Sequence, residues 1–275
     1  MNTLKLILLI SMLSGLLMIV GYLVARKTGV IVALVIAAVM NFGSYWFSDS
    51  IVLKMYQAQP VTRAEAPLLY DAVDALAAKA GIPMPKLYVI PTQTPNAFAT
   101  GRNENHSAVA VTAGLLNLMN REELEGVIAH ELSHIKHRDI LISTMAATIA
   151  SAVVLLSRWS VFFGSGDDGA AVRAVAVAIV APVAATLVQM AISRSREHEA
   201  DAGSAGITGN PEALASALGK LSRMARQAPL GANPATAHMF IVNPLSAGTV
   251  MGWFSTHPPV EKRIERLLAM KQAGQ

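Results

Sequence analysis

The residues best suited to chemistry form the segment His130-Glu131-Leu132-Ser133-His134. Residues four apart on a helix share one face, so the imidazoles of His130 and His134 can bind the same metal ion. Glu131 lies about 100° around the helix, beside the ion rather than pointing at it. This offset suits a general base that acts on water. The motif therefore predicts a metal-dependent hydrolase.

A later acidic segment is expected to supply a third ligand, because catalytic zinc usually has three protein ligands and one open position. In this segment Glu197 and Asp201 lie four residues apart. On a helix, one carboxylate can bind the metal while the other accepts the N–H of a ligand histidine. Spacing alone leaves His198 and Glu199 open as ligands in place of Glu197. The plain alternative is a solvated helix with i,i+4 ion pairs.

The composition indicates a membrane protein. The 275 residues are 53% hydrophobic and 15% charged, whereas an ordinary globular domain has about 25% charged residues. The chain has no cysteine, so a disulfide scaffold and thiolate metal ligands are excluded. The net charge of +4 is scattered along the sequence and forms no basic stripe. We therefore expect no nucleic-acid partner.

Four apolar stretches are long enough to cross a bilayer, which takes about 20 helical residues and at least about 17. They contain no Asp, Glu, Lys, Arg or His and comprise residues 6–24, 30–47, 140–157 and 174–193. We expect one transmembrane hairpin in residues 1–47, turning at 26–29, and a second in residues 140–193. The alternatives are a signal peptide for the first stretch and buried core helices for the second pair.

The polar segments 48–139 and 194–275 are expected to be two halves of one catalytic domain. Four spans place both halves and both termini on the same side of the membrane. Most Lys and Arg residues lie on that side, so the positive-inside rule predicts a cytoplasmic domain. Three aromatic residues near span ends fit the membrane interface: Tyr45, Trp46 and Trp159.

Local signals in the polar segments predict an α+β domain that is mostly helical. Thr62 and Glu65 match a capping box, which predicts a helix that ends at Gly81 and Pro83. Two short apolar runs, separated by loops rich in Pro, Asn and Gly, predict strands at residues 86–90 and 107–112.

Two more helices have clear start signals. Asn120 precedes Glu123 by three residues, a second capping box that begins the helix with the metal-site histidines. Asn210 precedes Pro211, and proline fits the first helical position. The first of these helices runs to about Asp139, directly before an expected span. The metal site must therefore lie close to the membrane face.

Five segments spread over nearly the whole chain carry a family resemblance. They are Pro95-Asn96-Ala-Phe-Ala-Thr-Gly101, His130-Glu131-x-x-His134, Ser193-Arg-x-Arg-Glu197-x-x-Ala-Asp201, Ala235-Thr-Ala-His238-Met-Phe and Ser255-Thr-His257-Pro-Pro. With these motifs the chain resembles the HtpX-type membrane metallopeptidases, which are relatives of the CAAX prenyl endopeptidases. One departure is His198, where the family usually has an aromatic residue.

The resemblance implies a gluzincin-like domain with one Zn²⁺ per chain, bound by His130, His134 and Glu197. It also implies that Glu131 is catalytic, that Asp201 supports the site, and that the protein lies in a bacterial inner membrane.

Two further residues are weaker candidates. Asn96 is a candidate for positioning the substrate backbone, with turn capping as the alternative. His257 is a candidate oxyanion donor, with a helix-entry role as the alternative. The remaining histidines are expected to be structural or on the surface: His106, His137 and His238.

The expected function is hydrolysis of peptide bonds in polypeptide substrates, by a membrane-bound zinc endopeptidase. The resemblance adds quality control of misfolded membrane proteins under stress. Two alternatives remain, a prenyl-protein endopeptidase and a non-catalytic scaffold or transporter with a structural metal site. A structural zinc site normally has four protein ligands, whereas three good candidates converge here. The sequence does not give the oligomeric state.

Overall fold

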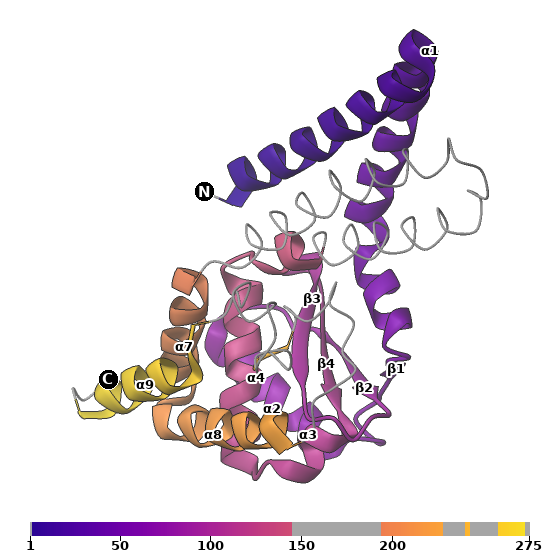
Figure 1. Cartoon of the computed structure of the whole chain (residues 1–275). Helices are drawn as coiled ribbons and strands as arrows, with labels where there is room; N and C mark the ends of the chain where they lie inside the picture. The colour runs from indigo at the N-terminus through magenta and orange to yellow at the C-terminus, as the bar shows by residue number, and fades with distance from the viewer. Residues whose placement is uncertain (1, 145–193, 228–239, 243–257, 273–275) are drawn as a thin grey trace.

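The computed structural model describes residues 2–144, 194–227, 240–242 and 258–272 (Figure 1). The expected spans 140–157 and 174–193 lie outside these residues, apart from the first five positions of the former. His238, His257 and Trp159 also lie outside them. The described chain is α+β and mostly helical, as the sequence predicts.

The N-terminal helix α1 (Asn2–Met55) doubles back on itself and forms two arms (Figure 1). The reversal coincides with Arg26, whose φ is 48°, within the four residues where the turn is expected. The arms touch so closely that a Cβ on Gly21 would collide with the Gly29 carbonyl. Asn41 also donates a hydrogen bond to Ser14 Oγ across the hairpin, 3.0 Å long.

One part of α1 has the length and apolar composition needed to cross a membrane. This part is Arg26–Phe47, which contains the second expected span, residues 30–47. Length and composition identify no other such helix within the described residues. The first expected span, residues 6–24, stays a prediction.

Four strands form one sheet in the order β1-β2-β4-β3. β2 pairs with β4 in parallel, and the other two pairs are antiparallel. The strands are β1 (Gln59–Pro60), β2 (Lys86–Ile90), β3 (Ala97–Asn103) and β4 (His106–Thr112). The sequence predicts β2 and β4. It does not predict β3, which lies at the edge of the sheet next to the helix with the metal-site histidines.

Helix α2 (Pro67–Ala80) begins later than the sequence predicts. Thr62 and Glu65 do interact, since the Glu65 carboxylate accepts the Thr62 N–H at 2.8 Å, but they form a turn. Ala66 precedes Pro67 and has a ψ of 64°, outside the α region that a following proline disfavours. The helix therefore starts at the proline. Its predicted end is confirmed, because Gly81 caps it with a φ of 71°.

The predicted starts of two other helices are confirmed. Asn120 and Glu123 form a complete capping box at α4 (Arg121–Lys136). Asn210 accepts the Ala213 N–H at 3.3 Å at the start of α8 (Pro211–Gln227). The remaining helices are α3 (Ala113–Leu118), α7 (Arg194–Thr208) and α9 (Val260–Gln272).

Helix α4 lies at the centre of the domain, with the sheet on one side and α7 to α9 on the other (Figure 1). Two glycines allow the closest approaches. A Cβ at Gly126 would lie 2.9 Å from the Leu214 backbone nitrogen of α8, and one at Gly203 would collide with Ser133. The resulting dense packing fixes the direction of the buried side chains on α4.

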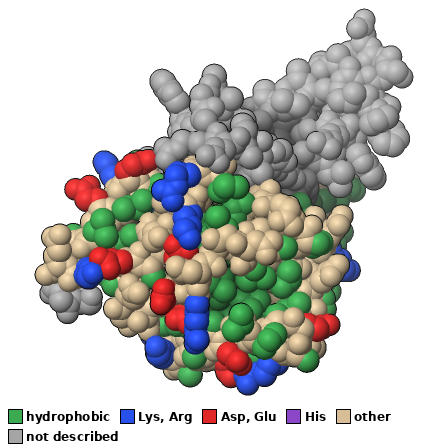
Figure 2. Space-filling view, turned by 90° about the horizontal axis from the view of Figure 1, so that it is seen from below, with side chains coloured by type: hydrophobic (Ala, Val, Ile, Leu, Met, Phe, Trp, Pro, Cys, Tyr) green, Lys and Arg blue, Asp and Glu red, His purple; other side chains and the backbone are tan. Residues whose placement is uncertain are grey.

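Acidic and basic side chains mix on the face that Figure 2 shows, with apolar side chains between them. This face is the underside of the molecule as drawn in Figure 1, where α8 and α3 lie.

Candidate metal centre

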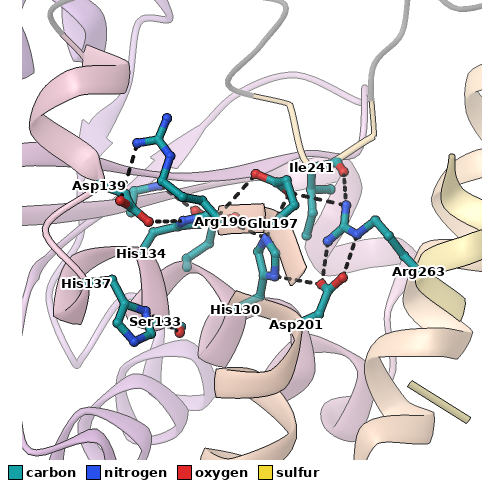
Figure 3. Close-up of polar contacts among 12 residues, drawn as sticks. His130, Ser133, His134, His137, Asp139, Arg196, Glu197, Asp201, Ile241 and Arg263 are labelled. Carbon is teal, nitrogen blue, oxygen red and sulfur yellow. Dashed lines mark hydrogen bonds and ion pairs between the residues drawn. The ribbon is translucent and has the colours of Figure 1, made fainter. Parts of the chain in front are cut away.

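The side chains of His130, His134 and Glu197 converge at the contact between α4 and α7 (Figure 3). The two Nε2 atoms are 3.2 Å apart. Glu197 Oε2 lies 3.7 Å from Nε2 of His130, and Oε1 lies 3.6 Å from Nε2 of His134. The part of the chain that the structure describes has no second group of this kind.

The two other ligands that spacing left open do not join this group. Glu199 is exposed, and His198 is only half-buried. Glu197, by contrast, is buried with 6% of its surface exposed. The helical rotation of about 100° per residue carries the neighbouring side chains away from the imidazole pair.

His130 is held by a carboxylate that is itself held by an arginine. Its Nδ1 lies 3.0 Å from Asp201 Oδ1. Arg263 donates from Nε to Asp201 Oδ2 at 2.9 Å and from Nη2 to Oδ1 at 2.7 Å. Its Nη1 donates to the Ile241 carbonyl at 2.9 Å. Burial raises the pKa of Asp201, but Arg263 and the contact with His130 outweigh it and lower the pKa to about 2.

His134 is held by a second set of the same residue types. Its Nδ1 lies 3.4 Å from Asp139 Oδ2, and Arg196 donates from Nη1 to Asp139 Oδ1 at 3.3 Å. Burial lowers the pKa of His134, but the contacts with Asp139 and Glu197 outweigh it and raise the pKa above its ordinary value. The surroundings of this imidazole therefore favour positive charge.

Glu131 lies beside the three candidate ligands and is 6% exposed. The backbone N–H of Ala99 on β3 donates to its Oε2 at 2.8 Å. Burial raises the pKa of Glu131 above its ordinary value, although the two histidines and the Ala99 N–H oppose the rise. A carboxyl group with a raised pKa, fixed next to a metal site, is suited to accept and return a proton.

The donor set fits a divalent cation. Both Nδ1 atoms lie next to a carboxylate, that of His130 3.0 Å from Asp201 and that of His134 3.4 Å from Asp139, which leaves the two Nε2 atoms as the available metal ligands. Ligand atoms at the usual zinc distances in a tetrahedral site lie about 3.4 Å apart, close to the observed 3.2, 3.6 and 3.7 Å. The charged side chains around this point are Glu131, Asp139, Glu197, Asp201, Arg196 and Arg263. When all four carboxyl groups are ionised, their charge exceeds that of the two guanidiniums by two, and a divalent cation neutralises this excess.

Asn96 is buried and makes hydrogen bonds within the protein, and its role toward substrate stays a prediction. It is 3% exposed, its Oδ1 accepts the Ile241 N–H at 3.2 Å, and its own N–H donates to Thr112. Asn96 thereby ties the start of β3 to the segment that also accepts from Arg263. His106 and His137 are exposed, as the sequence predicts.

Three residues around the metal centre were not predicted: Asp139, Arg196 and Arg263. The sequence contains a signal for Arg263, because it repeats with Val260, Ile264 and Leu267 on the apolar face of α9. A cation on an apolar face indicates a buried partner. Arg196 and Asp139 carry no such signal, since both lie at the ends of charged segments.

Strand β3 connects this site to the segments that lead toward the membrane. Ala99 of this strand donates its N–H to Glu131, and the next residue, Thr100, has its Oγ1 3.1 Å from Thr144 Oγ1. The guanidinium of Arg102 lies 4.5 Å from the ring centroid of Trp46 on α1, a cation–π distance. One strand therefore contacts the catalytic candidate, the hairpin and the start of the third apolar stretch.

Comparison with known proteins gives consistent results. The profile described as Peptidase family M48 matches residues 63–271. A protein named Protease HtpX homolog in Desulforapulum autotrophicum is 52% identical over 99% of this chain and 91% of the relative. A relative of the same name in Pyrococcus furiosus is 56% identical over 94% of this chain and 93% of the relative.

A third relative of that name, in Ralstonia nicotianae, is 50% identical over 99% of this chain and 98% of its own. The crystal structure of S. mikatae Ste24p matches with a TM-score of 0.51 and 18% identity. That match covers 97% of this chain and 63% of the other, and it indicates a shared fold.

Proposed function

The chain belongs to peptidase family M48 and is a membrane-bound metalloprotease, and from this premise we propose that it is a zinc endopeptidase that cleaves membrane proteins. Its proposed zinc ligands are His130, His134 and Glu197. One observation carries the proposal: two imidazole nitrogens and one carboxylate oxygen lie within 4.8 Å of one another beside a buried glutamate.

When bound, zinc supplies a Lewis acid that activates water and polarises the carbonyl of the scissile bond. Glu131 accepts the proton of the attacking water and returns it to the departing amine. The Ala99 N–H keeps the Glu131 carboxylate in place during both transfers. Asp201 and Asp139 hold the two imidazoles in the tautomer that presents Nε2.

Two further residues complete the proposed site. His257 donates a hydrogen bond to the oxyanion that develops during attack, and one such donor contributes about 3–4 kcal/mol to the transition state. Asn96 is a positioning residue, because it holds the Ile241 backbone whose carbonyl accepts from Arg263.

The proposed location is a bacterial inner membrane, with four spans and a gluzincin-like domain in the cytoplasm. Support comes from the chain path, since Asp139 supports His134 and is followed directly by the third apolar stretch. A site so close to the bilayer suits cytoplasmic loops and tails of membrane proteins as substrates. The resemblance to HtpX-type metallopeptidases adds a proposed role in quality control of damaged membrane proteins.

Substitution of Glu131 by Gln tests this proposal in the purified full-length chain. The protein is kept metal-free until zinc is added, because a protease digests itself during purification. We expect Glu131→Gln to bind one zinc per chain and to lose casein cleavage by about 10²–10⁴-fold, the usual contribution of a general base. The matched control is Glu122→Gln, an exposed residue on the same helix, which keeps both properties.

Full cleavage by Glu131→Gln would refute the assigned role, and failure of the wild type to bind metal would refute the metal site. Membership of a peptidase family sets aside the scaffold and transporter alternatives. The prenyl-protein alternative is tested by comparing a farnesylated peptide with the same peptide unmodified. A strong preference for the farnesylated form would replace the proposed substrate class.

A further inference from the structure

The two arginines of the metal centre lie on opposite sides of the imidazole pair (Figure 3) and differ in how their N–H groups are used. The N–H bonds of Nε and Nη2 run parallel along one edge of a guanidinium, which matches the two oxygens of a carboxylate. In Arg263 this edge binds Asp201. In Arg196 the same two nitrogens are buried and have no hydrogen-bond partner among the described residues.

A buried guanidinium with two nitrogens that lack hydrogen-bond partners destabilises a protein unless a ligand binds them. The Arg196 side chain is 8% exposed, and its described contact is the 3.3 Å hydrogen bond from Nη1 to Asp139. A buried charge normally has its remaining donors satisfied, since each hydrogen bond that is not made destabilises the protein. The free edge therefore indicates a ligand with two acceptor oxygens.

The chain has few side-chain carboxylates of its own left for this edge. Every Asp and Glu side chain lies among the described residues except Asp167 and Asp168. These two lie between the third and fourth apolar stretches, in a loop expected on the opposite side of the membrane from Arg196. A carboxylate from another molecule is a source that can reach this edge on the proposed cytoplasmic side.

We propose that the Nε–Nη2 edge of Arg196 binds a carboxylate of the polypeptide substrate, either an acidic side chain or the C-terminal carboxylate. This inference rests on the proposed peptidase function and adds a specificity determinant to it. Arg196 contacts Asp139, which in turn contacts the His134 imidazole, and each residue of an extended peptide spans about 3.3 Å. The preferred carboxylate is therefore expected within a few residues of the scissile bond.

The test uses the full-length chain in detergent micelles and a set of quenched fluorescent peptides with one neutral core sequence. One pair of peptides ends in a free carboxylate or in an amide. Other pairs carry Glu or Gln at each of four positions on either side of the bond. The measured quantity is the ratio of kcat/KM for the carboxylate peptide to that for its neutral partner, in the wild type, Arg196→Lys and Arg196→Gln.

We expect a wild-type ratio of about 10–100 for at least one pair, as a bidentate charge-assisted contact supplies. The ratio falls to about one in Arg196→Gln and to a few-fold in Arg196→Lys, which keeps the charge but loses the fork. The matched control is Arg223→Lys, an exposed residue on α8, which keeps the wild-type ratio. The pair that shows the preference tells whether the carboxylate is a side chain or a terminus.

A second readout does not depend on turnover. Fluorescence anisotropy measures binding of the same peptides to zinc-loaded Glu131→Gln, with and without Arg196→Lys, and the affinity ratios should follow the kinetic ones. A wild-type ratio near one for every pair overturns the inference, even if the Arg196 variants fail to fold. An unchanged ratio in Arg196→Lys and Arg196→Gln also overturns it.

Displacement of the probe by anionic-lipid vesicles, without any carboxylate preference, would instead assign the edge to a lipid phosphate. Failure of the proposed function gives a different result, because the neutral peptides would then not be cleaved at all.

Discussion

The two histidines of the metal centre are supported by similar sets of side chains that are completed to different degrees. Behind His130, Arg263 binds both oxygens of Asp201 and a backbone carbonyl. Behind His134, Arg196 makes one described hydrogen bond to Asp139, and its Nε and Nη2 have no partner among the described residues. In the first set all three nitrogens of the guanidinium have partners within the protein. In the second set, Arg196 retains hydrogen-bonding capacity for another molecule. Arg263 is therefore interpreted as a structural support and Arg196 as a binding element.

The largest effect is expected at the complete set. Arg263→Met leaves the buried Asp201 carboxylate uncompensated, so it should lower the free energy of unfolding by about 3–5 kcal/mol and reduce peptidase activity. Thermal and denaturant unfolding in detergent measure the change. Arg266→Met serves as the control, because Arg266 is exposed on the same helix. A loss below about 1 kcal/mol would remove the contrast between the two sets.

Metal affinity should respond to both aspartates. Asp201→Asn and Asp139→Asn keep the shape of the side chain but weaken its interaction with the imidazole Nδ1–H. Each should therefore reduce zinc affinity about 10–100-fold. Competition with a chelating dye measures the affinity. We expect the greater loss for Asp201→Asn, because its 3.0 Å contact with His130 is shorter than the 3.4 Å contact of Asp139 with His134. The reverse order would contradict the comparison.

A smaller effect is expected at the incomplete set. Arg196→Met removes one hydrogen bond of Asp139, but it also removes two buried N–H groups that lack an acceptor among the described residues. We therefore expect a loss of stability of only about 1–1.5 kcal/mol, measured as for Arg263→Met. If the two substitutions destabilise the protein equally, Arg196 is a structural residue.

The smallest effect is expected at Glu123, a buried carboxylate at the other end of α4 that serves as a reference. Burial raises its pKa, but hydrogen bonds from Lys220, Ser216 and the Asn120 backbone outweigh it and lower the pKa below 4.5. A lowered pKa means that the contribution, about 1 kcal/mol, is complete above pH 4.5 and disappears as the pH falls further. Unfolding of wild type and Glu123→Gln at pH 3–7 measures it. A difference that grows on acidification would contradict the sign.

The sequence predicts the side chains that converge on the metal because they follow from local geometry. Positions four apart on a helix must share a face, so His130 and His134 had to meet once the capping box at Asn120 fixed the helix. Glu197 could not be distinguished from Glu199 by spacing. The resemblance made that choice, and the packing of α7 on α4 brings Glu197 to the imidazole pair.

The features that the sequence did not predict depend on distant parts of the chain. β3 contains Gly101 and Asn103 and has no alternating pattern, and it becomes a strand because β4 pairs with it. The partner of Arg263 lies 62 residues away, so the apolar face of α9 signals that a buried partner exists but does not identify it. At Thr62 the capping pattern was a misleading signal, because the proline five residues later controls where α2 begins.

The order in which the metal-site residues are synthesised follows from where they lie in the sequence. His134 leaves the ribosome 63 residues ahead of Glu197, a delay of several seconds at about 5–20 residues per second. Arg263, which secures the Asp201 carboxylate, emerges later still, on α9. We therefore expect the nascent chain to gain full activity only after α9 has been made. By then all four apolar stretches have left the ribosome. Peptidase activity therefore develops after the expected membrane spans have been made, which protects the growing chain and its neighbours from early cleavage.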